Sequence, residues 1–237
     1  FVAGATLFVL AYFTVSIPNP NDFVNTQSTI IQYSNGSEIG RIGAQNRTIL
    51  PLAKMPWNLR HAVLAAENRN FYSEHAFSVS GFARAVIENI RTLGNGGGGS
   101  TITQQYAKTA FLTQERTITR KIKELVIAIK LENQLTKDQI FENYLNTIYF
   151  GRGAYGVETA SQQYFNRSAS QLTLAQSAVI ASVLRSPGYY DPQYGANNLK
   201  RLQGRFQYVI DGMVKAGWLD KATAAKVKFP TIMPGTK

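Results

Sequence analysis

The chain has 237 residues, enough for one medium domain or two small lobes with a buried core. Lysine and arginine number 25 against 14 acidic residues, and the formal net charge of +11 indicates an anionic partner such as a phospholipid surface, a phosphorylated substrate or a nucleic acid. The absence of cysteine excludes disulfides, structural thiolate zinc sites and cysteine nucleophiles.

An uncharged apolar segment, residues 1–17, comes first and is followed by prolines and asparagines at 18–21. As a helix it would extend about 26 Å, close to the ~30 Å hydrocarbon thickness of a bilayer. A signal peptide usually has a shorter apolar region and a small-residue cleavage site after it. We therefore expect a single transmembrane helix over 1–17, with a buried core helix as the alternative, and the remaining residues outside the cytoplasm.

Residues 18–55 predict an extended region that contains a β-hairpin. The apolar runs at 29–33 and 39–42 flank Asn35-Gly36, the strongest short hairpin signal.

Beyond Pro56 the pattern becomes helical, and strand signal is slight. Apolar spacing and turn residues predict the following helices: 59–67, 82–93, 118–135, 140–149, 172–184, 198–216 and 220–228. Thr136 and Gln139 are typical of an N-cap before the helix at 140–149. The fold class is therefore mainly α.

A glycine run at 94–99 satisfies the spacing G-x-G-x-x-G. A predicted helix precedes it instead of a strand, and no lysine stands before Ser100, so a nucleotide-binding loop is not indicated. We expect a mobile loop that leads to Ser100.

A donor-rich segment follows the glycines and ends at Lys108. Ser or Thr followed three residues later by Gln is a capping box, so the segment could be only a helix start. Two adjacent glutamines and a lysine favour ligand contacts as well, and the amides of a helix N-terminus favour an anion. The candidate ligand residues here are Ser100, Thr101, Gln104, Gln105 and Lys108.

A cationic cluster comes next, with Arg116, Arg120, Lys121 and Lys123, and such a cluster alone is most often a solvated face. Arg120 and Glu124 have the i, i+4 spacing of a surface ion pair worth about 0.3–0.5 kcal/mol. Lys108, together with Arg116 and Lys121, could instead bind a diphosphate.

Glu67 ends an apolar helical stretch and is followed by polar and aromatic residues, as in the wall of a cleft. The two histidines, His61 and His75, match no metal-ligand spacing. No nucleic-acid motif is present, and a membrane anchor argues against a nucleic-acid partner.

Five segments occur in order and resemble the motifs of the peptidoglycan glycosyltransferase (transglycosylase) domain of class A penicillin-binding proteins, glycosyltransferase family 51. They are ENRNF at 67–71, GSTITQQ at 99–105, RKIKE at 120–124, KDQIFENYLN at 137–146 and AVIASVLRSP at 178–187. The resemblance covers roughly residues 57–192. It predicts a lysozyme-like helical lobe and a small, membrane-associated jaw lobe within a domain at 56–230.

The resemblance implies an enzyme of bacterial cell wall synthesis. Its substrate would be lipid II, polymerised by inverting transfer into β-1,4-linked glycan strands with release of undecaprenyl pyrophosphate. The protein would be a single-pass protein of the bacterial cell membrane, with its catalytic domain on the extracytoplasmic face. The growing glycan strand, the inhibitor moenomycin and proteins of a cell-wall synthesis complex would be its other partners.

The resemblance also assigns roles to residues. Glu67 matches the general base that activates the acceptor 4-hydroxyl, and Glu124 matches the second essential carboxylate. The implied substrate-binding residues are Ser100, Thr101, Gln104, Gln105, Lys108, Arg116, Arg120, Lys121 and Asn146. A divalent cation, Mg²⁺ or Mn²⁺, stays open, with no metal ligand assigned.

The sequence departs from the family pattern at Asn68 (usually Asp), Glu74 (usually His), Ala76 (usually Gly) and Thr109 (usually Asn). Two alternatives stay open: a membrane-anchored, non-catalytic scaffold that binds lipid II, and a lysozyme-like wall hydrolase. The chain has no Ser-x-x-Lys, so residues 231–237 are expected to begin a linker to a transpeptidase domain outside this sequence.

Overall fold

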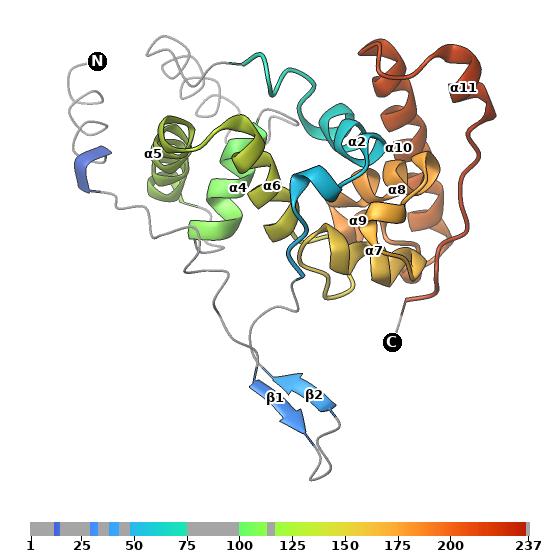
Figure 1. Cartoon of the computed structure of the whole chain (residues 1–237), viewed down its shortest axis with the longest axis horizontal. Coiled ribbons are helices and arrows are strands. Elements are labelled where there is room, and N and C mark those ends of the chain that lie inside the picture. The colour runs from blue at the N-terminus through green and yellow to red at the C-terminus, as the bar shows by residue number, and fades with distance from the viewer. Residues whose placement is uncertain are drawn as a thin grey trace. The chain divides into compact units, whose positions relative to one another are not determined.

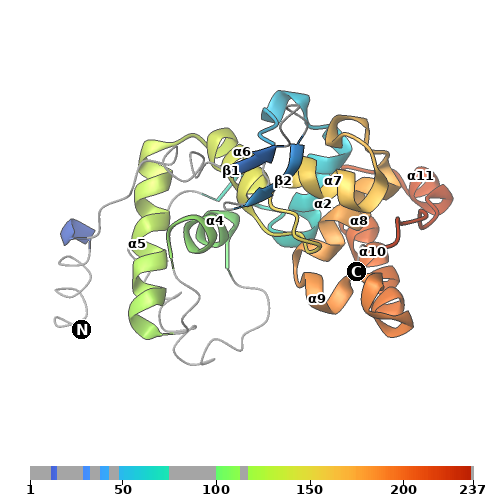
Figure 2. The same cartoon turned by 90° about the horizontal axis from the view of Figure 1, so that it is seen from below.

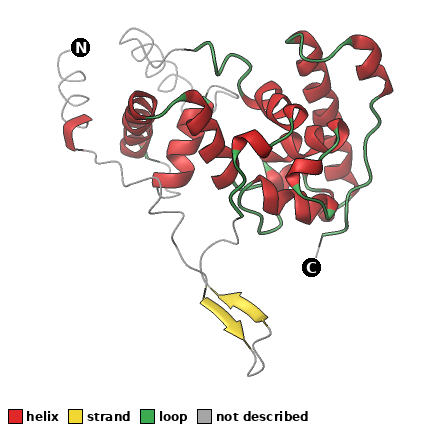
Figure 3. Ribbon diagram, viewed as in Figure 1, coloured by secondary structure: helices red, strands yellow, loops and turns green. Residues whose placement is uncertain are grey.

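The computed structural model describes residues 12–14, 29–32, 38–42, 48–74, 100–112 and 117–235. The chain divides into two compact units, here called unit 1 (residues 1–17 and 67–144) and unit 2 (residues 18–66 and 145–237). Helix dominates the described residues, as predicted, and the strands are confined to one short pair (Figure 3).

Several predicted elements fall outside the described residues. They are the transmembrane helix at 1–17 apart from the helical residues 12–14, the helix at 82–93 and the glycine run at 94–99. Within the part of the chain that the structure describes, no helix is both long enough and apolar enough to cross a membrane.

Unit 1 is built around two helices that lie side by side, α4 (Ile102–Phe111) and α5 (Ile118–Gln134) (Figure 2). Their apolar faces are fully buried, with Ile102 and Tyr106 on α4 and Leu125, Val126 and Leu131 on α5. The α5 helix closely matches the helix predicted at 118–135, because its 3.6-residue apolar period is read directly from the sequence.

Helix α6 (Lys137–Thr147) follows after a short turn. It begins at Lys137, before the predicted start at 140, because Thr136 caps it: the Gln139 amide donates to Thr136 Oγ1 at 3.2 Å, and Gln139 Oε1 accepts from the Thr136 amide at 2.8 Å. The predicted cap is confirmed, and the helix begins directly after the capping residue Thr136.

Unit 2 contains the strand pair. Strands β1 (Thr29–Gln32) and β2 (Glu38–Ile42) are antiparallel, with Thr29 opposite Ile42. The predicted hairpin strands are therefore confirmed, and the Asn35-Gly36 turn lies outside the described residues.

The helical part of unit 2 surrounds α8 (Leu174–Leu184) (Figure 1). Every residue of α8 from 177 to 184 is buried, and α10 and α7 pack against it. The other elements of unit 2 are η1 (Leu52–Lys54), α2 (Trp57–Glu67, its last residue in unit 1), α7 (Val157–Phe165), η2 (Ala169–Gln171), α9 (Pro187–Tyr190), η3 (Pro192–Tyr194), α10 (Ala196–Lys215) and α11 (Lys221–Lys226).

The α7 helix was not predicted. Gly156 precedes it with φ of 82° and supplies no capping side chain, so the sequence lacks the usual start signal. A Cβ at Gly156 would lie 2.7 Å from the backbone oxygen of Asn146, so this tight approach requires glycine.

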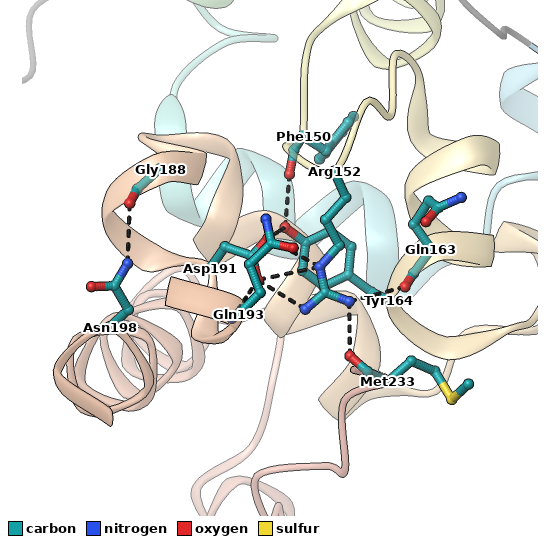
Figure 4. A network of polar contacts seen from close by, with 9 residues as sticks. All are labelled: Phe150, Arg152, Gln163, Tyr164, Gly188, Asp191, Gln193, Asn198 and Met233. Carbon is teal, nitrogen blue, oxygen red and sulfur yellow. Dashed lines mark hydrogen bonds and ion pairs between the residues drawn. The ribbon is translucent and has the colours of Figure 1, made fainter. Parts of the chain in front are cut away.

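A buried ion pair joins the segments of unit 2 that follow α6 (Figure 4). Arg152 Nε donates to both carboxylate oxygens of Asp191 at 3.0 and 3.2 Å, and Nη2 donates to Asp191 Oδ1 at 2.8 Å. Arg152 Nη1 donates to the backbone oxygens of Gln163 and Met233 at 3.1 and 2.8 Å. The Met233 amide donates to the backbone carbonyl oxygen of Tyr164 at 2.9 Å, so the segment after α11 is held against α7.

Candidate functional site

Glu67 lies at the C-terminal end of α2, after an almost fully buried stretch, residues 62–66. The carbonyl of the preceding residue, Ala66, accepts a hydrogen bond from Arg205 Nη2 at 2.8 Å. A guanidinium at a helix C-terminus satisfies an end carbonyl and complements the helix dipole. The helix end that presents Glu67 is thus fixed by burial and by α10.

The turn after Glu67 is held against α6 within unit 1. Phe71 is buried, with its ring centroid 5.8 Å from that of Phe141, and Tyr72 donates to Asp138 Oδ1 at 2.8 Å. Asn68 Nδ2 donates to Glu74 Oε2 at 3.1 Å, so two positions that depart from the family pattern bond to each other.

The donor-rich segment begins α4 with a capping box. The Gln104 amide donates to Thr101 Oγ1 at 3.2 Å, and the Thr101 amide donates to Gln104 Oε1 at 3.3 Å. Gln104 is buried in this arrangement. The capping interpretation of the motif therefore holds for this pair, and it leaves Ser100 and Gln105 to face the candidate site.

Gln105 connects the predicted base to two other groups. Its Nε2 donates to Glu67 Oε2 at 2.9 Å and, more weakly, to the Ser100 carbonyl at 3.4 Å. Its Oε1 accepts from the hydroxyl of Tyr144 at 2.9 Å. Burial, followed by the charge of Glu67, raises the pKa of Tyr144 well above its ordinary value, so this hydroxyl stays protonated.

Lys121 connects the same segment to the second carboxylate. Its Nζ donates to Ser100 Oγ at 3.3 Å and forms an ion pair with Glu124 Oε1. Glu124 is 2% exposed and lies 3.5 Å from Arg120 Nη1. The i, i+4 spacing of Arg120 and Glu124 is typical of a surface ion pair. Because the Glu124 carboxylate is buried, the two side chains do not form a surface pair here.

These contacts form one continuous chain, here called the carboxylate relay: Glu67, Gln105, Ser100, Lys121 and Glu124. Every member belongs to unit 1. One end presents a carboxylate to accept a proton, and the other presents cations held by a second carboxylate.

Arg120 has unused hydrogen-bonding capacity beside the relay. Its Nε and Nη1 are buried, and neither donates a hydrogen bond within the described part of the chain. The Nη1 contact with Glu124 has ion-pair distance without hydrogen-bond geometry. Buried guanidinium donors without acceptors favour an anionic ligand at this end of the relay.

Three other predicted ligand residues have no part in the contacts that define the relay. Lys108 is exposed in the last turn of α4, and Arg116 lies outside the described residues. Asn146 belongs to unit 2, where its amide pairs with the backbone of Leu50: Oδ1 accepts from the Leu50 amide at 2.9 Å and Nδ2 donates to the Leu50 carbonyl at 3.0 Å. This pairing gives Asn146 a structural role, and its substrate-binding role stays a prediction.

The described residues offer little to a metal ion. Among them, no group of three or more His, Asp or Glu side chains is placed to hold one. Glu124 is already paired with Lys121 and Arg120. Among the described residues, the Glu124 carboxylate is thus occupied by cations and forms no part of a metal-ligand set.

Comparison with known proteins gives the same family as the motifs. A profile of the transglycosylase family matches residues 35–214. The chain is 43% identical over 233 residues to penicillin-binding protein 1A of Mycobacterium tuberculosis, covering 96% of this chain and 28% of that protein. It is 39% identical over 222 residues to penicillin-binding protein 2a of Streptococcus pneumoniae, covering 93% of this chain and 29% of that protein.

A crystal structure of penicillin-binding protein 1A from Haemophilus influenzae also matches, with 24% identity and a TM-score of 0.49, over 89% of this chain and 22% of that one. The chain spans less than a third of the length of the curated relatives that it matches.

Proposed function

The chain belongs to the transglycosylase family, the peptidoglycan glycosyltransferase domain of class A penicillin-binding proteins, and from that premise we propose that it polymerises lipid II into β-1,4-linked glycan strands. The observation that carries the proposal is the carboxylate relay, which joins Glu67 to a cationic cluster through Gln105 and Ser100. A glycosyl transfer to a sugar hydroxyl needs a base at one side and positive charge at the other.

Glu67 is proposed as the general base. Its carboxylate takes the proton from the 4-hydroxyl of the acceptor sugar while that oxygen forms a bond to the anomeric carbon of the donor. Positioned proton transfer of this kind contributes about 10²–10⁴-fold to the rate. The hydrogen bond from Gln105 Nε2 holds the carboxylate and favours its ionised form.

Lys121 and Arg120 are proposed to act on the leaving group. As the new bond forms, the bond between the anomeric carbon and the diphosphate oxygen breaks, and undecaprenyl pyrophosphate departs with the electron pair. Preorganised cations stabilise the charge that develops on that oxygen. Glu124 holds both cations in place, and the buried donors of Arg120 are available to the diphosphate.

The rest of the proposal concerns substrate and place. The formal charge of +11 suits a dianionic lipid diphosphate at a membrane surface. We place the protein in the bacterial cell membrane, anchored through residues 1–17, with the catalytic domain on the extracytoplasmic face. A lysozyme-like lobe, a membrane-associated jaw, moenomycin binding and partners in a cell-wall synthesis complex belong to the same proposal.

The test is polymerisation of lipid II by the full chain and by Glu67→Gln. The change is isosteric, so we expect an unchanged melting temperature, retained lipid II binding and a fall in polymer formation of at least about 100-fold. Turnover at the normal rate would remove the base assignment. Cleaved wall fragments without polymer would indicate a hydrolase, and binding without product in the unmodified chain would indicate a scaffold.

A further inference from the structure

Tyr144 is a residue whose chemistry the sequence did not reveal. It lies on α6 with its side chain fully buried, and its hydroxyl is 2.9 Å from Gln105 Oε1. A buried tyrosine hydroxyl usually has a hydrogen-bond partner, so burial and a hydrogen bond alone do not indicate a role in the reaction. What distinguishes Tyr144 is that its partner is the amide that contacts the proposed base.

The direction of each hydrogen bond around Gln105 follows from the chemistry of its neighbours. Nε2 faces two groups, the Glu67 carboxylate and the Ser100 carbonyl, and both can only accept when Glu67 is ionised. The NH₂ group must therefore point towards Glu67, and Oε1 must point towards Tyr144. The Tyr144 hydroxyl must then donate, because Oε1 has no proton to give.

Resting on the proposed function, we propose that Tyr144 is a positioning residue for the transfer reaction: by donating to Gln105 Oε1, it fixes the orientation of that amide and keeps the Nε2 donor on Glu67. The groups come from three elements: Glu67 ends α2, Gln105 lies in the first turn of α4, and Tyr144 lies on α6. The tyrosine does not touch the reacting atoms.

The loss of the hydroxyl has a defined physical consequence. Gln105 Oε1 would lose its donor, and an amide without that constraint can rotate. Rotation would turn Oε1 towards Glu67 and replace an attraction with a repulsion between two acceptors. Either result removes stabilisation from the ionised base, so the pKa of Glu67 would rise in the variant.

The same residue type offers a matched control in unit 2. Tyr164 is also fully buried, and its hydroxyl donates to the Phe150 carbonyl at 2.9 Å and lies 3.3 Å from Asp191 Oδ2. Tyr164→Phe therefore removes a buried, hydrogen-bonded hydroxyl at a site that has no part in the relay. This variant therefore measures how much activity and stability the protein loses when any buried, hydrogen-bonded tyrosine hydroxyl is removed.

The experiment measures kcat and KM for lipid II, and the pH profile of kcat/KM, in the full chain, Tyr144→Phe, Gln105→Ala, their double variant and Tyr164→Phe. We expect Tyr144→Phe to lower kcat about tenfold, with KM within about twofold, and to move the acid limb to higher pH. In the Gln105→Ala background, the same change should have no further effect. Tyr164→Phe should leave the acid limb in place.

Among the residues that the structure describes, the charged and titratable groups of the relay and its direct partners are Glu67, Tyr144, Lys121, Arg120 and Glu124. Of these, only Tyr144 differs between wild type and Tyr144→Phe. A normal kcat and an unmoved acid limb in Tyr144→Phe would overturn the positioning role. An equal loss with and without Gln105 would also overturn it, since the effect would then bypass the amide. Glu67→Gln, assayed in parallel, tests the proposed function separately: if that variant polymerises normally, the base assignment itself fails.

Discussion

Lys121 and Glu124 form an ion pair one helical turn apart on α5, and the carboxylate of the pair is almost fully buried. A surface pair at this spacing would contribute a few tenths of a kcal/mol. Here Glu124 also faces Arg120, so one carboxylate balances two cations at the proposed leaving-group end of the relay.

Glu124→Gln should abolish polymerisation and lower the free energy of unfolding by about 1–3 kcal/mol, because two cations lose their counter-charge in a partly buried site. Glu132→Gln is the matched control: Glu132 lies on the same helix and pairs with Lys137 at 3.2 Å, outside the relay. We expect a comparable loss of stability and normal polymer yield in the control. Equal activity in the two variants would contradict a role for Glu124 in the reaction.

Thr101→Ala should remove the cap of α4 and cost about 1 kcal/mol of stability. Thr173→Ala removes the equivalent cap of α8, where the Gln176 amide donates to Thr173 Oγ1 at 3.3 Å. Both variants should melt at similarly reduced temperatures. Only Thr101→Ala should also lower turnover several-fold, because Gln105 lies in the turn that this cap holds, and Thr101→Ser should restore it. Unchanged turnover in Thr101→Ala would show that Gln105 is held without the cap.

Arg152→Lys should destabilise unit 2 by about 2–4 kcal/mol, since lysine cannot reproduce the planar fork that binds Asp191 and two carbonyls. Thermal unfolding monitored by circular dichroism measures the loss. Arg201→Lys is the control, because Arg201 is exposed and its guanidinium carbon lies 4.2 Å from the centroid of the Tyr189 ring. This change should lower the free energy of unfolding by less than about 0.5 kcal/mol. A similar small cost at both sites would show that the buried fork adds no stability.

His61 should make unit 2 less stable in acid. Burial lowers the pKa of His61 from its ordinary value of 6.5, and the nearby Arg60 acts in the same direction against the hydrogen bond with the Trp57 carbonyl. The unfolded chain then binds the proton more readily, so stability is full above pH 6.5 and falls as the pH drops towards the lowered, folded-state pKa. His61→Phe, which keeps a ring against Trp57, should lose less stability than the unmodified chain between about pH 8 and about pH 5. An identical acid dependence of the melting temperature in both proteins would contradict this.

Local signals in the sequence predicted much of the structure. The capping boxes, the hairpin strands and the α5 helix depend on residues within a few positions of one another, and each is present as expected. The two departures at Asn68 and Glu74 also prove to be local, because they bond across a single turn.

Long-range relationships could not be predicted in the same way. Gln105 contacts Glu67 across 38 positions and Tyr144 across 39, and no local pattern specifies which tyrosine fills that place. The spacing of Arg120 and Glu124 was visible in the sequence, but the burial of Glu124 results from the packing around α5. The motif predicts a substrate-binding role for Asn146, which stays a prediction, but it gives no sign of the pairing between the Asn146 amide and the backbone of Leu50.

The position of α8 in the chain has a consequence for folding during synthesis. It is apolar on all sides, and it leaves the ribosome before α10, one of the helices that cover it, has been made. Until α10 has been synthesised, the nascent chain exposes an apolar segment, which chaperones recognise and which aggregates when nothing covers it. A stop codon between the two helices would therefore yield an insoluble product, while one placed after α10 would allow the helical core to close.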